Sequence, residues 1–66
     1  MKLVKGKTYT APNTVLRAKV ITIFHYSEKY TKAKILLTTP GHIVEMKTYK
    51  LYHNRIQHWE EVCSTS

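Results

Sequence analysis

The sequence predicts an all-β domain of five short antiparallel strands, and three observations carry that prediction. Several stretches are dense in β-branched and aromatic residues, which favour strands. The clearest of them, Tyr30–Thr39, alternates apolar residues with lysines at a period of two, as a half-buried strand does. Turn signals separate these stretches, above all Pro40-Gly41.

The length of 66 residues leaves room for a single domain, which we assign to residues 1–66. We expect about residues 3–62 to be ordered and residues 63–66 to form a tail. Cys63 is the one cysteine of the chain, which excludes an internal disulfide. No segment has the roughly 18 apolar residues of a membrane span, and no signal peptide is recognisable. These features predict a cytoplasmic protein, in the host cytoplasm if its source is a virus or phage.

The first half of the chain predicts three strands. Thr8–Thr10 is short and β-prone, and Pro12 stops it. Val15–Tyr26 is rich in β-branched and aromatic residues, and the following Ser27–Lys29 reads as a turn. The alternating strand Tyr30–Thr39 follows this turn and runs antiparallel to Val15–Tyr26.

The second half predicts two more strands after the Pro40-Gly41 turn. His42–Tyr49 is a strand candidate. Residues 50–57 have no clear period, and His58–Val62 is a short closing strand.

The Pro40-Gly41 turn predicts a register for its hairpin. Pairing that is symmetric about the turn makes one face apolar throughout. The predicted opposite pairs are Leu37 with Val44, Ile35 with Met46, Ala33 with Thr48, Leu36 with Glu45, and Lys34 with Lys47. A four-residue loop in the same register is an alternative, because a Pro-Gly type II turn has the wrong twist for a two-residue hairpin.

The preceding hairpin, folded about Ser27-Glu28, places Val20 opposite Ile35 and Ala18 opposite Leu37. Strict alternation would leave both Ile21 and Ile23 facing outward, so we expect a β-bulge near Ile21 to turn one of them inward. The predicted core is Val20, Ala33, Ile35, Leu37, Val44, Met46, Leu51, Ile56 and Trp59, with Phe24 added as a core aromatic.

Charge is the strongest compositional signal. There are 11 Lys and Arg against 4 acidic residues, for a net charge of +7. Residues 1–55 carry 11 − 2 = +9, and residues 56–66 carry −2. A basic body favours a polyanionic partner, either nucleic acid or an acidic protein surface, while the alternative is a charged surface that serves solubility.

The predicted registers gather basic side chains on the sheet face opposite the core. Lysine with interleaved aromatics suits phosphate contacts combined with stacking on unpaired bases. The alternative for each tyrosine is that it pads the edge of the core with its hydroxyl in water. The candidate nucleic-acid-binding residues are Arg17, Lys19, Lys32, Lys34 and Lys47, with Tyr30 and Tyr49 for stacking.

The order of the predicted elements resembles the SH3-like small barrels, through the opening GKTYTAP, the meander ending in PGHIVEM and the closing NRIQHWEEV. The resemblance implies a five-stranded antiparallel barrel with a short 3₁₀ turn within residues 50–55, before the last strand. The acidic and double-aromatic signatures of proline-peptide-binding SH3 domains are missing. The chain is closer to the basic KOW-like and Sm-like modules, which often bind nucleic acid or protein. An OB-type barrel is the rival fold, but 66 residues is short for one.

Metal binding and catalysis are not expected. The histidines His25, His42, His53 and His58 lack metal-ligand spacing, and no second cysteine completes a set. No grouping of base, orienting residue and nucleophile stands out, and no glycine-rich phosphate loop exists. We therefore predict a protein that is not an enzyme and has no cofactor.

Two classes of function remain. The first is a small basic module that contacts nucleic acid through the lysine-rich face. The second is a phage or bacterial protein-interaction modulator that docks on an acidic partner protein. An exposed apolar patch or an open strand edge would favour this second function. Such an edge would also allow a homo-oligomer.

Overall fold

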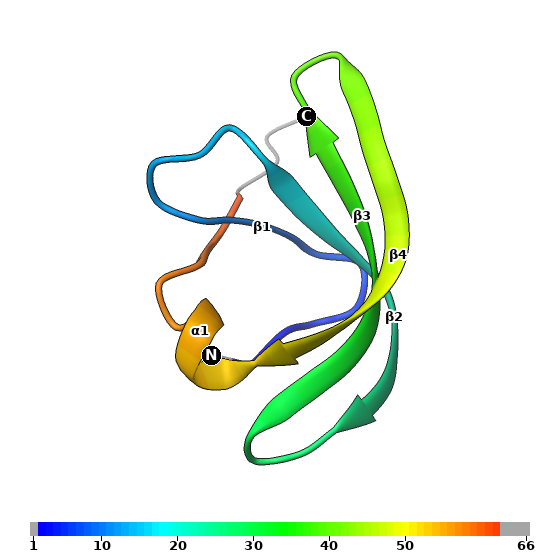
Figure 1. Ribbon diagram of the computed structural model, residues 1–66, viewed down its shortest axis with the longest axis vertical. Helices are drawn as coiled ribbons and strands as arrows, with labels where there is room; N and C mark the ends of the chain where they lie inside the picture. The colour runs from blue at the N-terminus through cyan, green and yellow to red at the C-terminus, as the bar shows by residue number, and fades with distance from the viewer. Residues whose placement is uncertain (1, 63–66) are drawn as a thin grey trace.

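The structure is a computed structural model that describes residues 2–62. The predicted tail 63–66, with Cys63, lies outside the described residues. The elements, in chain order, are β1 (Thr8–Thr10), β2 (Arg17–Tyr26), β3 (Tyr30–Thr39), β4 (His42–Tyr52), α1 (His53–Ile56) and β5 (Glu60–Glu61) (Figure 1). The all-β class and the five antiparallel strands predicted from the sequence are confirmed.

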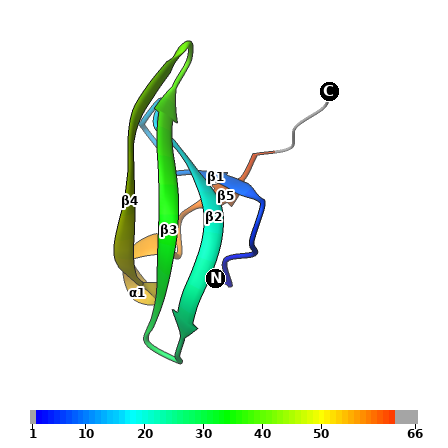
Figure 2. The ribbon, with the colours of Figure 1, turned by 90° about the vertical axis from the view of Figure 1, so that its right-hand side faces the viewer.

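The five strands form one sheet in the order β4-β3-β2-β1-β5. Because β4 and β5 stand at opposite ends of this order, the sheet is not closed into a barrel. Figure 1 shows the three long strands bowed, with β1 and α1 on their hollow side. Figure 2, turned by 90°, shows β4, β3 and β2 side by side. The helix α1 is the only one in residues 2–62, and it is too short to span a membrane.

The turn before β5 differs from the expected 3₁₀ turn. β4 continues to Tyr52 instead of ending at Tyr49, and α1 is a single α-helical turn of four residues. Ile56, at the end of α1, is buried. The short helix thus adds Ile56 to the core.

The core lies on the hollow side of the sheet, which we call the core face. β2 and β3 supply Ala18, Val20, Ala33 and Ile35 to it, each at most 4% exposed. Leu3, Tyr9 and Ile56 cover these side chains from the other elements. Of the predicted core residues, Val20, Ala33, Ile35 and Ile56 are buried, while Leu37, Leu51 and Trp59 are partly buried against the same cluster.

The β2–β3 hairpin follows the predicted register from Arg17 to Val20, and two shifts displace it nearer the turn. Val20 pairs with Ile35 and Ala18 with Leu37. The pairing shifts at Ile21, which confirms the expected bulge, and Ile23 then turns inward and packs against the core. A second shift falls at Phe24, whose side chain is 58% exposed. The assignment of Phe24 to the core was therefore wrong, because the second bulge releases it from the ladder.

The predicted register of the β3–β4 hairpin was wrong for most of its length. It holds next to the turn, where Thr39 pairs with His42 and Thr38 with Ile43. The pairing then shifts by one residue at Val44. The observed opposite pairs beyond it are Leu37 with Glu45, Leu36 with Met46, Ile35 with Lys47, Lys34 with Thr48, and Ala33 with Tyr49.

A one-residue shift exchanges the two faces of a strand, since side chains alternate with a period of two. Val44 and Met46, predicted to be in the core, are 53% and 54% exposed instead. Tyr49 and Leu51 take up positions on the core face and pack against the core cluster. The bulge thereby reconciles the register set by the turn with the burial of Tyr49 and Leu51.

Candidate functional site

The outer face is the side of β2, β3 and β4 that points away from the core. Residues directly opposite each other on neighbouring strands share a face, so the observed register places its side chains in rows. From the Pro40-Gly41 end to the other, the rows are Arg17, Thr38 and Ile43; Lys19, Leu36 and Met46; Thr22, Lys34 and Thr48; His25, Lys32 and Lys50; and finally Tyr30 and Tyr52.

Four of the five predicted basic site residues lie together on this face: Arg17, Lys19, Lys32 and Lys34. Lys47 does not lie with them. It is opposite the buried Ile35, on the core-face side of β4. Its side chain is nevertheless exposed to solvent. Its predicted placement was wrong because of the bulge at Val44. Lys50, which sequence reasoning missed, completes the set of five cations.

The like-charge pair of the outer face is therefore Lys32 with Lys50, not Lys34 with Lys47. The two residues are direct cross-strand neighbours, and both side chains are exposed. Like charges in this position are mildly destabilising. Lys34 instead faces the neutral Thr48 on one side and Thr22 on the other.

The three long strands bring no carboxylate to the outer face. Glu45 lies on the core-face side, opposite Leu37. Glu60 belongs to β5 and lies in the same row as Thr10 and Arg17, with the one strand β1 between it and Arg17. Among residues 2–62 the one ion pair joins Lys7 and Glu61, with 3.1 Å between Nζ and Oε2. The five outer-face cations thus have no carboxylate partner in this part of the chain.

Aromatic rings occupy the end of the outer face farthest from Pro40-Gly41. Tyr30 and Tyr52 are opposite each other, with ring centroids 5.7 Å apart. The ring of His25 lies 5.6 Å from that of Tyr30. The ammonium of Lys50 lies 4.4 Å from the Tyr30 centroid and 5.5 Å from the Tyr52 centroid, within range of a cation–π interaction. We call His25, Tyr30, Tyr52, Lys32 and Lys50 the aromatic end.

The second predicted stacking residue, Tyr49, is not on the outer face. It lies on the core face opposite Ala33, and its hydroxyl donates a hydrogen bond to the carboxylate of Glu45. This hydrogen bond is the main cause that raises the pKa of Tyr49, with smaller contributions from desolvation and from the charge of Glu45. Tyr52, three residues along the strand, has the outer-face position instead.

His53 ties the aromatic end to the rest of the fold. Its backbone N–H donates to the carbonyl oxygen of Lys29 at 2.9 Å, which joins α1 to the β2–β3 turn. Its ring Nδ1 lies 3.1 Å from the carbonyl oxygen of Glu28, and its Nε2 lies 2.7 Å from the hydroxyl of the buried Thr31. Because a carbonyl oxygen only accepts, Nδ1 carries the proton and, in the neutral ring, Nε2 accepts from Thr31. These contacts fix the end of β4, and hence Tyr52, beside Tyr30.

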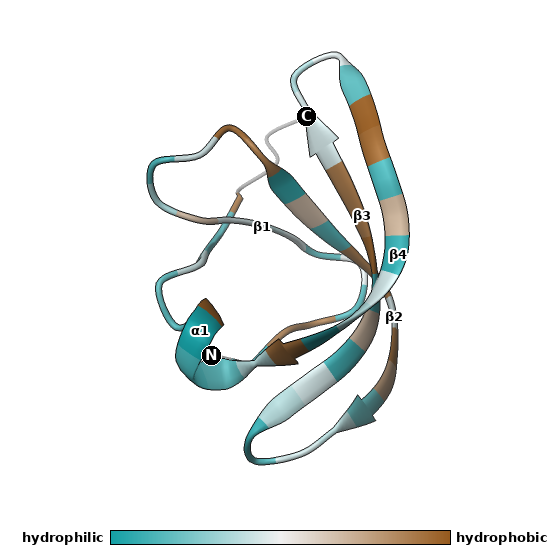
Figure 3. Cartoon of the chain, viewed as in Figure 1, coloured by the Kyte–Doolittle hydropathy of each residue, from teal (hydrophilic) through white to brown (hydrophobic). Residues whose placement is uncertain are grey.

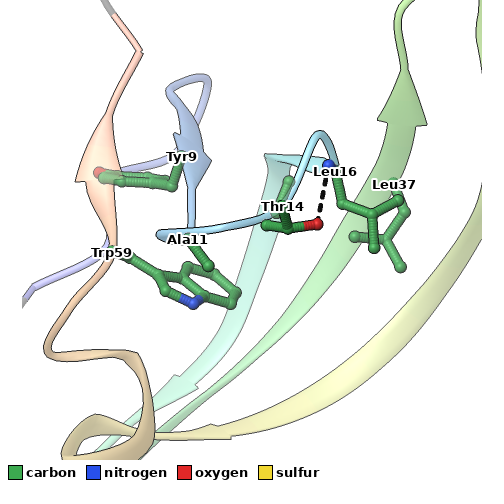
Figure 4. Close-up of a pocket in the computed structure, with 7 residues that line it drawn as sticks. Tyr9, Ala11, Thr14, Leu16, Leu37 and Trp59 are labelled. Carbon is green, nitrogen blue, oxygen red and sulfur yellow. Dashed lines mark hydrogen bonds between the residues drawn. The ribbon is translucent and has the colours of Figure 1, made fainter.

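The hollow side of the sheet carries a different feature, an apolar pocket between β1, β2 and Trp59. Its lining includes Tyr9, Ala11, Leu37 and Trp59 (Figure 4). Thr14 also lines it, but its hydroxyl already accepts a hydrogen bond from the backbone N–H of Leu16 at 3.1 Å. The pocket presents hydrophobic surface and no charged group.

Within residues 2–62, no three His, Cys, Asp or Glu side chains come together in a way that could hold a metal ion. His25 and His53 are instead engaged with tyrosines, at 5.6 Å from Tyr30 and 5.2 Å from Tyr26 between ring centroids. His25 and His53 therefore have aromatic neighbours in place of metal ligands.

No protein-family model, curated protein or solved structure matches the chain.

Proposed function

We propose that the protein is a small nucleic-acid-binding module whose outer face contacts the phosphate backbone. One observation carries the proposal: five cations converge on one sheet face to which the three long strands add no carboxylate. Such a surface attracts a polyanion, and binding releases the counterions that its phosphates hold. Contacts of this kind carry little sequence information, so binding is tolerant of sequence and steeply weakened by salt.

A titration of a labelled oligonucleotide at several salt concentrations tests the proposal. The variant Lys32→Gln with Lys34→Gln removes two outer-face charges, and we expect weaker binding and a salt slope shallower by up to about two contacts. The control Lys5→Gln with Lys47→Gln removes the same net charge from exposed positions off this face. It should retain most of the affinity. Equal losses in both variants would mean that net charge, and not the outer face, determines binding.

The alternative function is a phage or bacterial modulator that docks on an acidic partner protein. The observation that favours it is the apolar group at the hairpin end of β4, where Ile43 is 73% exposed beside the exposed Val44 and Met46 (Figure 3). β4 also stands at one end of the sheet, where an extended acidic segment or a second copy of the chain could add a strand. Ile21 and Ile23 do not contribute, because both are half-buried.

The two functions separate in an affinity capture from cytosol with and without nuclease. A protein that stays bound after nuclease, and is lost from the Ile43→Ser variant, would favour the docking function. Loss of all bound material on nuclease treatment, with Ile43→Ser behaving like the parent protein, would favour nucleic acid. Sedimentation of the purified protein reports separately whether β4 pairs two copies.

A further inference from the structure

The nucleic acid that suits the outer face is single-stranded. We propose that the aromatic end stacks on unpaired bases while the cations of the neighbouring rows follow the backbone, an inference that rests on the proposed function. An unpaired base presents its π-face to an aromatic side chain, whereas stacking within a duplex hides that face. A surface that combines exposed rings with lysines therefore binds single strands in preference to a duplex.

Tyr52 is the ring best placed for stacking. It is 41% exposed and lies at the end of the outer face, with Tyr30 supporting it from the neighbouring strand. Lys50 and Lys32 form the adjacent row, and the ammonium of Lys50 already lies within 5.5 Å of the Tyr52 centroid. A base stacked on Tyr52 thus has Lys50 beside it, with Lys32 in the same row as Lys50, to meet its phosphate.

Hydrogen bonds anchor the backbone at the aromatic end. His53 follows Tyr52 directly and is held by its three hydrogen bonds to Lys29, Glu28 and Thr31. Fixing the backbone at this point reduces the ordering that binding would otherwise require. The backbone that carries Tyr52 is therefore anchored beside Tyr30.

The rest of the described chain offers little to a duplex. α1 has four residues, too few for a recognition helix in a major groove. The outer face itself is the convex side of three bowed strands, opposite the hollow side that holds the core (Figures 1 and 2). A bowed surface with rings at one end suits a flexible strand that follows the curvature.

The cations set the path of that strand. Lys32 and Lys34 are two residues apart on one strand, which is about 7 Å along the sheet, and Lys19 and Arg17 continue the line of charge toward the Pro40-Gly41 end. A backbone that starts at the aromatic end thus passes cations in four successive rows. Along this path the aromatic rings come first and the cations follow. The aromatic end therefore fixes one end of the bound segment.

The test compares labelled single-stranded DNA, single-stranded RNA and duplex DNA of equal length at low salt, with the parent protein and two variants of one residue. Tyr52→Ala removes the ring, and we expect its affinity for a single strand to fall roughly 5- to 150-fold, the range of one stacked base. Tyr52→Phe keeps the ring and should stay within about twofold of the parent. Neither change should alter duplex binding, and circular dichroism checks that both variants fold.

The outcomes distinguish this inference from the proposed function. If Tyr52→Ala leaves single-strand affinity unchanged, or if the duplex binds as tightly as the single strands, the stacking inference is overturned while the basic surface can still stand. If no oligonucleotide binds at low salt, the nucleic-acid function itself fails, and a protein partner takes its place. The two single strands compared with each other report whether the 2′-hydroxyl contributes.

Discussion

The two faces of the same three strands differ in almost every property. On the core face, Val20 and Ala33 are fully buried and Ile35 is 1% exposed. One residue further along the same strands, the outer face carries cations and tyrosines. The pleat alone separates the two sets, because neighbouring side chains on a strand point to opposite sides. The comparison teaches that a position's face, and not its residue type, decides whether its side chain packs in the core or stays on the outer surface.

In β4, a shift of one residue in the pairing exchanges the residues of the two faces. Met46 and Lys47 are neighbours, and the sequence places the methionine in the core and the lysine on the basic surface. The bulge at Val44 reverses both assignments. Substitutions on the two sides of β3 and β4 test whether the two faces are assigned correctly.

The largest expected effect is on stability. Ile35→Ala should cost about 2–5 kcal/mol of unfolding free energy, because it opens a cavity in the buried core. Met46→Ala, at a position 54% exposed on the outer face, should cost about 0.5 kcal/mol or less. Urea unfolding monitored by the fluorescence of Trp59 gives both values. A loss at Met46 similar to that at Ile35 would restore the symmetric hairpin register and reverse the faces of β4.

A smaller effect concerns the repulsion between Lys32 and Lys50. Lys32→Gln removes one charge of this cross-strand pair and leaves the contacts of Lys50 with the tyrosines in place. We expect a gain of about 0.2–0.5 kcal/mol in unfolding free energy at low salt. The gain should disappear at high salt, which screens exposed charges.

The control for this prediction is Lys47→Gln, since Lys47 faces Ile35 and has no cationic residue opposite it. It should produce no such gain. If both variants gain equally, the effect reflects total charge and gives no information about which lysines share a face.

The smallest expected effect is a titration on the core-face side of β4. The hydrogen bond that Tyr49 donates to Glu45 raises the pKa of Tyr49. In the Glu45→Gln variant the pKa of Tyr49 should therefore be lower than in the parent protein. Ultraviolet absorbance of tyrosinate during a pH titration measures the change. A pKa of Tyr49 that is unaffected by Glu45→Gln would show that the two side chains do not share the core-face side.

The sign of the linked effect on stability follows from that direction. A tyrosine whose folded-state pKa is raised favours folding in its neutral form. The contribution is complete below the unfolded-state pKa, about 10, and is lost as the pH rises through the folded-state pKa. It is therefore present at neutral pH and absent in strong base.

The sequence by itself determined β3 and its pairing with the first half of β2. The alternation of Ala33, Ile35 and Leu37 with Lys32 and Lys34 predicted the two faces of that strand, and the pair Ile21 and Ile23 required a bulge where the structure has one. Four of the five outer-face cations followed from this, because β2 and β3 carry them. These features are local, since each depends on the period of one strand or on one turn.

Only the tertiary structure decided the face of β4. Apolar residues occur on both alternations of this strand, at Ile43, Val44 and Met46, so either register buries something. The Pro40-Gly41 turn fixes the register at one end, while the packing of Tyr49 and Leu51 against the core fixes the opposite alternation at the other. One extra residue, Val44, satisfies both constraints. The choice of Lys50 and Tyr52 over Lys47 and Tyr49 depends on this long-range packing, which no periodicity within the strand can express.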